Sequence, residues 1–175
     1  MIEVRQEDLV TANVECILRS VGSTLEPLTA IGKAVEEAAG EDLLERMEKL
    51  GDLPVGGAVI TPAGNLSASF IVHVALRSHE EPISAGSVRQ ALLNGLRHAS
   101  RMGVETMALP PLGTGAGNLD ADTSADAMLE VLRDHMQNEE YPREVTVMVS
   151  TEYEWQAFDA RLRGPDPEVH DPTAD

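Results

Sequence analysis

Short apolar runs and amphipathic segments alternate along most of the chain. The apolar runs predict strands at residues 14–18, 58–61, 70–74 and 107–109, and alternation of apolar with polar residues predicts two more at 2–5 and 144–149. Between them, apolar residues recur at helical spacing and predict helices at 29–39, 41–50, 88–101, 121–136 and 155–162. This order indicates an α/β domain with helices on both faces of a mostly parallel sheet.

The chain is long enough for one domain whose core needs neither disulfide nor metal. Its single cysteine, Cys16, lies in an apolar run and is expected to be a small buried residue. We assign residues 1–163 to this domain. Residues 164–175 contain three prolines and four acidic residues, and we expect them to form a disordered tail.

Charge narrows the range of partners. Thirteen basic residues against thirty acidic ones give a net charge of -17, which argues against binding of nucleic acid or of an anionic membrane surface. No apolar run approaches the roughly 20 residues of a membrane span, and residues 1–5 lack the features of a signal peptide, so we expect a cytoplasmic protein. Because the acidic residues are spread along the chain, we hypothesise a salt-adapted or otherwise acid-surfaced organism. A melting temperature that does not rise with molar KCl would count against this.

One stretch combines a strand, a glycine loop and a helix start. The predicted strand at 107–109 is followed by two prolines, by glycines at positions 113, 115 and 117, and by Asn118. Glycine permits positive φ and a close approach of the backbone to a ligand, while backbone N–H groups and the positive end of a following helix favour an anion such as phosphate. The loop is a candidate phosphate site; the alternative is that its glycines only make a tight turn.

Two nucleotide-binding motifs fit this loop poorly. A P-loop requires a lysine that is missing here, and a dinucleotide fingerprint requires glycine where Asn118 stands. In a parallel sheet, ligands bind beyond the carboxyl ends of the strands, where the glycine loop, residues 22–24 and Asp8 would converge. The residue patterns therefore predict an anion or nucleotide pocket.

The histidines give no metal signal. His73 lies inside a predicted strand and is expected to be a buried histidine with its hydrogen bonds satisfied. His79 stands beside Glu80 and Glu81 in a proline-containing loop, which is weak evidence for a metal site. We assign neither a metal nor a cofactor.

The order of these motifs resembles the macro domain, an ADP-ribose-binding module. The resemblance covers residues 2–162 and is most specific at residues 108–117, which are similar to the family's loop around the distal phosphate and the adjoining ribose. It implies a three-layer α/β/α sandwich with a mixed, mostly parallel central sheet. It also implies that Asp8, with Leu9, holds the adenine, and that the phosphates and ribose contact Gly22, Ser23, Gly113, Thr114, Gly115, Ala116, Gly117 and Asn118.

The chain departs from the family where catalysis takes place. Members that cleave ADP-ribose esters typically carry Asn-Ala-Ala-Asn after the second strand, where this chain has Arg-Ser-Val-Gly at 19–22. The family's first glycine-rich loop falls on residues 26–30, which lack glycine and add Glu26, and the catalytic aspartate of some members falls on Gly32. An exposed Glu26 a few ångströms from a diphosphate would repel it by about 1 kcal/mol. Residues that could substitute in the site are Arg19, Thr24, Glu26 and Tyr153.

Three functions are consistent with these features. The first is a module that binds ADP-ribose or a related adenine nucleotide and has no catalytic residue. The second is a hydrolase of ADP-ribosyl or O-acetyl-ADP-ribose bonds with a replacement set such as Glu26, Arg19 and Thr24, in which Glu26 acts as general base. The third is a vestigial pocket in a domain that contacts a protein partner.

Overall fold

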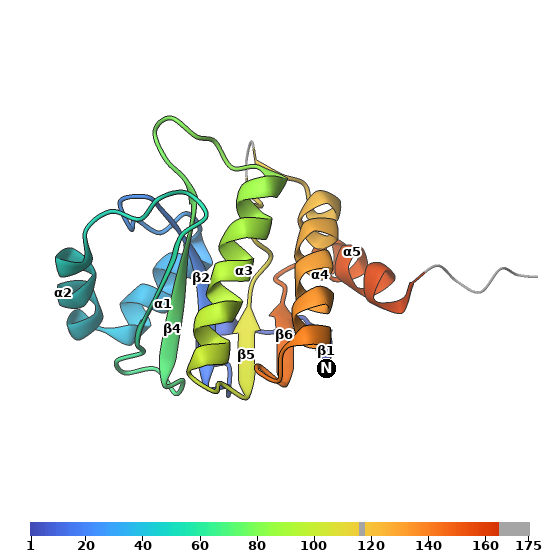
Figure 1. Cartoon of the computed structure of the whole chain (residues 1–175), viewed down its shortest axis with the longest axis horizontal. Coiled ribbons are helices and arrows are strands. Elements are labelled where there is room, and N and C mark those ends of the chain that lie inside the picture. Colours follow the sequence, from blue (N-terminus) through green and yellow to red (C-terminus); the bar gives the residue numbers. More distant parts are fainter. Residues whose placement is uncertain (116–117, 165–175) are drawn as a thin grey trace, which may run out of the picture.

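The computed structural model describes residues 1–115 and 118–164. Its centre is a six-stranded sheet in the order β1 (Ile2–Arg5), β6 (Glu144–Met148), β5 (Thr106–Leu109), β2 (Cys16–Gly22), β4 (Phe70–Arg77) and β3 (Ala58–Pro62). Neighbouring strands are parallel except β3 and β4, which are antiparallel. The prediction of a mixed, mostly parallel sheet is confirmed (Figure 1).

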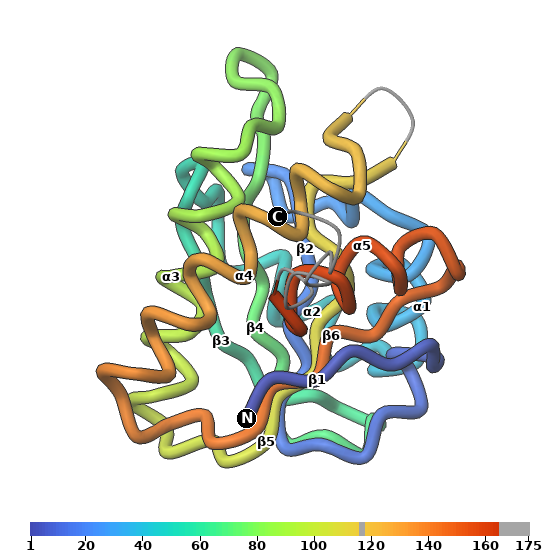
Figure 2. Tube along the Cα trace, turned by 90° about the vertical axis from the view of Figure 1, so that its right-hand side faces the viewer, coloured from blue at the N-terminus to red at the C-terminus, as the bar shows by residue number. Residues whose placement is uncertain are grey.

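Helices cover both faces of the sheet. One face carries α3 (Ala85–Arg101) and α4 (Ala121–Asn138), and the other carries the 3-10 helix η1 (Leu9–Thr11), α1 (Ala30–Ala39) and α2 (Glu41–Leu50). The last helix, α5 (Glu152–Arg163), packs against α4 and β1. Figure 2 shows α3 and α4 on one side of the strands and α1 on the other. The chain thus forms the expected three-layer α/β/α sandwich.

The central strand β2 is buried from both sides. Its Cys16 and Leu18 join the apolar cluster under α3 and α4, whereas Ile17 and Val21 join the cluster under α1 and α2. Because successive side chains of a strand point to opposite faces, such a strand carries apolar residues continuously. Burial raises the pKa of the Cys16 thiol to about 12, so the thiol stays protonated and inert at neutral pH. The prediction that Cys16 is a small buried residue is confirmed.

Capping residues, rather than the apolar stripes, determine where the helices begin. The side chains of Thr29, Ser84, Asp120 and Thr151 each accept a hydrogen bond from a backbone N–H in the first turn of α1, α3, α4 and α5. As a result, α3 and α5 begin at Ala85 and Glu152, ahead of the first apolar residue of each predicted stripe.

The predicted end of the second strand is wrong. The apolar run predicts a strand that ends at residue 18, but β2 continues to Gly22, and Arg19 lies in its middle with no exposed surface. A buried charge is strongly unfavourable unless it is paired. The error arose because the partners of Arg19 are distant in the sequence.

A polar network surrounds Arg19 between the sheet and α1. Its Nε donates to Nδ1 of His73 (2.8 Å), and its Nη1 donates to a carboxylate oxygen of Glu36 (2.6 Å) and to the carbonyl of Gly32 (3.2 Å). Since Nδ1 of His73 accepts, its Nε2 carries the proton and donates to the hydroxyl of Thr61 (2.9 Å). The network therefore joins β2, β4, β3 and α1.

The histidine of this network is neutral. Burial, and next the charge of Arg19, hold the pKa of His73 well below its usual range. Burial also lowers the pKa of Arg19, while the hydrogen bond and the charge of Glu36 raise it; a guanidinium nevertheless remains charged. The prediction that His73 is a buried, hydrogen-bonded histidine is confirmed.

This network predicts that the folded state loses stability in mild acid. Below the unfolded-state pKa of about 6.5, the unfolded chain binds a proton on His73 that the folded chain does not, so the free energy of unfolding falls by about 1.4 kcal/mol per pH unit for this proton. The loss continues until the pH reaches the lower pKa of the folded state. Guanidinium denaturation between about pH 7.5 and pH 5 measures it. His73→Gln, which can accept from Arg19 and donate to Thr61, should remove this slope; equal slopes in the two proteins would contradict the prediction.

Candidate functional site

Parallel pairing brings the carboxyl ends of β1, β6, β5, β2 and β4 to one edge of the sheet. The residues that follow these strands include Asp8 after β1, a turn at 22–26 after β2, the segment 78–84 after β4 and the glycine loop after β5. In Figure 1 the segments after β4 and β5 lie at the top of the view, above the ends of their strands. This edge is where the polar side chains of different loops come together.

The described part of the glycine loop has a backbone that only glycine adopts readily. Gly113 has a φ of +79° and Gly115 a φ of +129°. A Cβ on Gly113 would lie only 2.9 to 3.1 Å from three apolar side chains, so this position also lacks space. The N–H of Leu119 donates to the carbonyl of Gly113 (3.0 Å), and that of Asn118 donates to the carbonyl of Gly115 (3.1 Å). The loop thus closes on itself; Ala116 and Gly117, also expected in the site, lie outside the described residues.

Helix α4 anchors this loop and caps its own N-terminus. The hydroxyl of Ser124 donates to the carbonyl of Leu112 (2.7 Å). The carboxylate of Asp120 accepts a hydrogen bond from the backbone N–H of Thr123 (2.7 Å). This hydrogen bond, together with one from the side chain of Thr123, holds the pKa of Asp120 below its usual range. Because Asp120 already meets the positive end of the helix, an anion at this loop depends on the loop's own N–H groups more than on the helix.

The turn after β2 places a carboxylate over its first residue. The N–H of Gly22 donates to the carbonyl of Glu26 (2.8 Å), and the N–H of Leu25 donates to the carbonyl of Gly22 (2.9 Å). Leu25 has a φ of +70°, which is unusual for a residue with a side chain. The hydroxyl of Thr24 donates to the carboxylate of Glu26, and a Cβ on Gly22 would overlap that carboxylate. An anion that approaches Gly22 therefore meets Glu26 first.

A hollow of about 490 Å³ opens between this turn, the loop after β4 and the glycine loop. It brings together four of the expected site residues and adds three polar residues that sequence reasoning missed. The missed residues lie at the carboxyl end of β4. Their position at the end of an interior parallel strand was the sequence signal that could have marked them as site residues. The expected residues are Ser23, Thr24, Glu26 and Asn118, and the added ones are Arg77, Ser78 and His79.

Other expected residues lie outside this hollow. Arg19 does not line it, because its guanidinium is buried against α1 by Glu36 and Gly32, so this guanidinium is not available to an anion in the hollow. Asp8 is exposed and accepts a hydrogen bond from the N–H of Val10 (3.0 Å), while Leu9 is buried beside it. Tyr153, in the first turn of α5, is 60% exposed.

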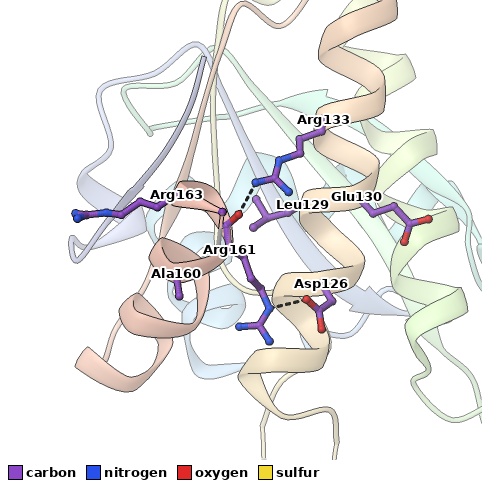
Figure 3. Close-up of a pocket in the computed structure, with 8 residues that line it drawn as sticks. Asp126, Leu129, Glu130, Arg133, Ala160, Arg161 and Arg163 are labelled. Carbon is purple, nitrogen blue, oxygen red and sulfur yellow. Dashed lines mark hydrogen bonds and ion pairs between the residues drawn. The ribbon is translucent and has the colours of Figure 1, made fainter. Parts of the chain in front are cut away.

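A larger hollow, of about 1110 Å³, lies between α4 and α5 (Figure 3). None of its lining residues comes from the loops that follow the strands. Figure 3 shows Arg161 turned towards Asp126 and Arg133 towards the carbonyl of Arg161. Because neighbouring groups already engage these guanidinium groups, we place the candidate site at the strand ends instead.

Two further kinds of site have no support in residues 1–115 and 118–164. No three histidine, cysteine or acidic side chains there are grouped so that they could hold a metal ion. The helices in these ranges also lack the combination of length and apolarity that a membrane crossing requires.

Comparison with known proteins identifies the family. The sequence model of the macro domain matches residues 20–128. An O-acetyl-ADP-ribose deacetylase of Escherichia fergusonii is 29% identical over 150 residues, which are 82% of this chain and 85% of that protein. An uncharacterized protein of Mycobacterium bovis is 28% identical over 134 residues, or 77% of this chain, but the chain spans only 37% of that protein's length.

Solved structures confirm the fold. The macrodomain of Oceanobacillus iheyensis, determined with ADP, superposes with a TM-score of 0.84 over 93% of this chain and 90% of that one, at 19% sequence identity. At this identity the likeness establishes the fold alone. Together with the family match over more than half of its length, it shows that the chain belongs to the macro domain family.

Proposed function

We propose that this macro domain binds ADP-ribose or a related adenine nucleotide along the carboxyl edge of its sheet and does not hydrolyse it. The glycine loop is the observation that carries the proposal. Gly113 and Gly115 hold backbone conformations that favour glycine, and hydrogen bonds within the loop and to α4 fix its ends. The backbone N–H groups of a glycine loop at a strand end suit a phosphate. That the macrodomain of Oceanobacillus iheyensis was determined with ADP supports the same class of ligand.

We assign the adenine to the part of the site next to β1, where Asp8 and Leu9 follow that strand. Asp8 is exposed there, and within residues 1–115 and 118–164 its carboxylate accepts a single hydrogen bond, from the N–H of Val10, so the carboxylate has capacity to accept from the amino group of adenine. Leu9 is buried beside it and offers an apolar support. Exposed Tyr153 is the aromatic side chain nearest in sequence to the end of β6, and it is a candidate for stacking on the base.

Absence of catalysis is inferred from the β2 turn. Position 22 is a glycine without a side-chain amide, and Glu26 has its carboxylate held by Thr24 over that glycine. Arg19, part of the replacement set considered for a hydrolase, is buried in the network with His73 and Glu36. The hydrolase alternative retains one supporting observation, since Glu26, Thr24 and His79 line the same hollow. Turnover of O-acetyl-ADP-ribose that is lost in Glu26→Gln would favour that alternative.

The binding proposal predicts that Gly115→Val weakens the nucleotide complex. There is space for a Cβ at position 115, but valine does not readily adopt a φ of +129° and should force the loop out of its conformation. Affinity for ADP-ribose should therefore fall by about tenfold or more. Isothermal titration calorimetry with ADP-ribose, AMP and ribose 5-phosphate measures this, and wild type should bind ADP-ribose more tightly than AMP. Gly103→Val is the matched control, because Gly103 also has a positive φ in open space but lies at the opposite end of β5. No heat with any ligand in the folded wild type would favour a vestigial pocket with a protein partner.

A second prediction concerns the carboxylate of Glu26. A carboxylate about 4 Å from a phosphate repels it by about 1 kcal/mol in water. Glu26→Gln removes this repulsion and should therefore raise the affinity for ADP-ribose about fivefold. Glu45→Gln, on the exposed face of α2, is the control and should leave affinity unchanged. Weaker binding by Glu26→Gln would contradict the prediction, because it would mean that the carboxylate accepts hydrogen bonds from the ligand.

A further inference from the structure

Helix α3 differs in charge from the other helices. Among the α-helices of the described residues, it alone contains neither aspartate nor glutamate, although the chain has 30 acidic residues against 13 basic ones. Its basic residues are Arg89, Arg97, His98 and Arg101. Three of them occupy its C-terminal half, at the end of the helix remote from Ile83 and the strand-end hollow.

This C-terminal half borders a groove of about 320 Å³. The opposite wall is the segment that leads into β3, with Leu53, Pro54 and Ala58. The carbonyl of Ala58 accepts from Nε2 of His98 (3.1 Å), which ties the helix to the strand. Asn94 of α3 likewise donates across the groove to the carbonyl of Gly56 (2.7 Å). The groove therefore has a fixed backbone and a partly apolar lining.

The arginines of the groove have no acidic partner in the described part of the chain. Arg89, one turn into α3, pairs with Glu130 of α4 at 3.0 Å. Arg97 donates to the side-chain oxygen of Asn94 (3.4 Å), and neither Arg97 nor Arg101 lies within 4.0 Å of a carboxylate oxygen of residues 1–115 and 118–164. Both are exposed. In a protein with a net charge of -17, this is a local basic surface.

We propose that this groove, bounded by Arg97, Arg101 and the start of β3, binds an acidic, extended segment of a partner protein. Residues at i and i+4 of a helix lie about 5 to 6 Å apart, and side chains at i and i+2 of an extended peptide are about 6.6 Å apart, so a Glu-x-Glu sequence matches Arg97 and Arg101. β3 is one of the two edge strands of the sheet, and an edge strand can offer backbone groups to an incoming strand, although the carbonyl of Ala58 is already engaged by His98.

A basic surface can also bind nucleic acid, but the observations favour a peptide at this groove. The overall charge of -17 repels a polyphosphate more strongly than a short peptide with a few carboxylates. Leu53 and Pro54 suit the apolar side chain between two carboxylates, and they offer nothing to a phosphate. The surface is separate from the nucleotide site, so its test is independent of the proposed function.

Fluorescence anisotropy with a labelled Ser-Glu-Val-Glu-Val-Glu-Ser peptide tests the proposal on the full chain at low salt. We expect saturable binding that is about tenfold weaker in the Arg97→Gln, Arg101→Gln double variant and that falls with added NaCl. Arg89→Gln is the matched control and should change affinity less than about twofold, because that arginine is paired outside the groove.

Four results would overturn the proposal. The first is absence of saturable binding by the peptide, and the second is equal affinity for a peptide with glutamine at the three glutamate positions. The third is an equal loss of affinity in the double variant and in Arg89→Gln. The fourth is tighter binding of a labelled oligothymidylate than of the peptide, where this binding depends on the same two arginines. Thermal melts show whether each variant is folded; since Arg97 and Arg101 are exposed, their substitution should leave the melting temperature close to that of wild type.

Discussion

Parallel backbone pairing of β1, β6, β5, β2 and β4 is the constraint on which the candidate site depends. Parallel strands all end at the same edge, so loops that are far apart in the sequence meet there without any direct attraction between them. Helices on both faces bury the strands and hold this edge rigid. The loops are consequently the variable part of the domain, and their side chains determine what the edge binds.

Strand β2 runs from the interior of the domain to the candidate site. β2 holds the buried Arg19 in its middle and ends at Gly22. Arg19 is compensated by Glu36 and by neutral His73, and these contacts tie α1 to the sheet. At the end of the same strand, Glu26 covers Gly22. β2 thus carries a buried charge in its middle and is followed by a carboxylate at the candidate site.

Much of the fold was predictable from local signals. Continuous apolar runs identified the interior strands, and helical periodicity identified the five α-helices that the described residues form. The glycines at 113 and 115 marked a loop that needs positive φ. The length of β2 was not predictable, because the residues that compensate Arg19 are 54 and 17 positions away and a lone arginine ordinarily ends a buried strand. The position of Arg77, Ser78 and His79 at the end of a parallel strand could have marked them, but their closeness to Thr24 and Glu26 depends on the meeting of three loops.

A titration of the ¹⁵N-labelled protein with ADP-ribose, followed by amide chemical shifts, tests the central claim most directly. The account predicts that the largest shift changes occur along one edge of the sheet, at Gly113, Gly115 and Asn118 and at Ser23, while Val59 on the edge strand β3 remains unchanged. Saturable changes confined to the hollow between α4 and α5, around Leu129 and Ala160, would contradict the account. The absence of any change at high ligand concentration would contradict it equally.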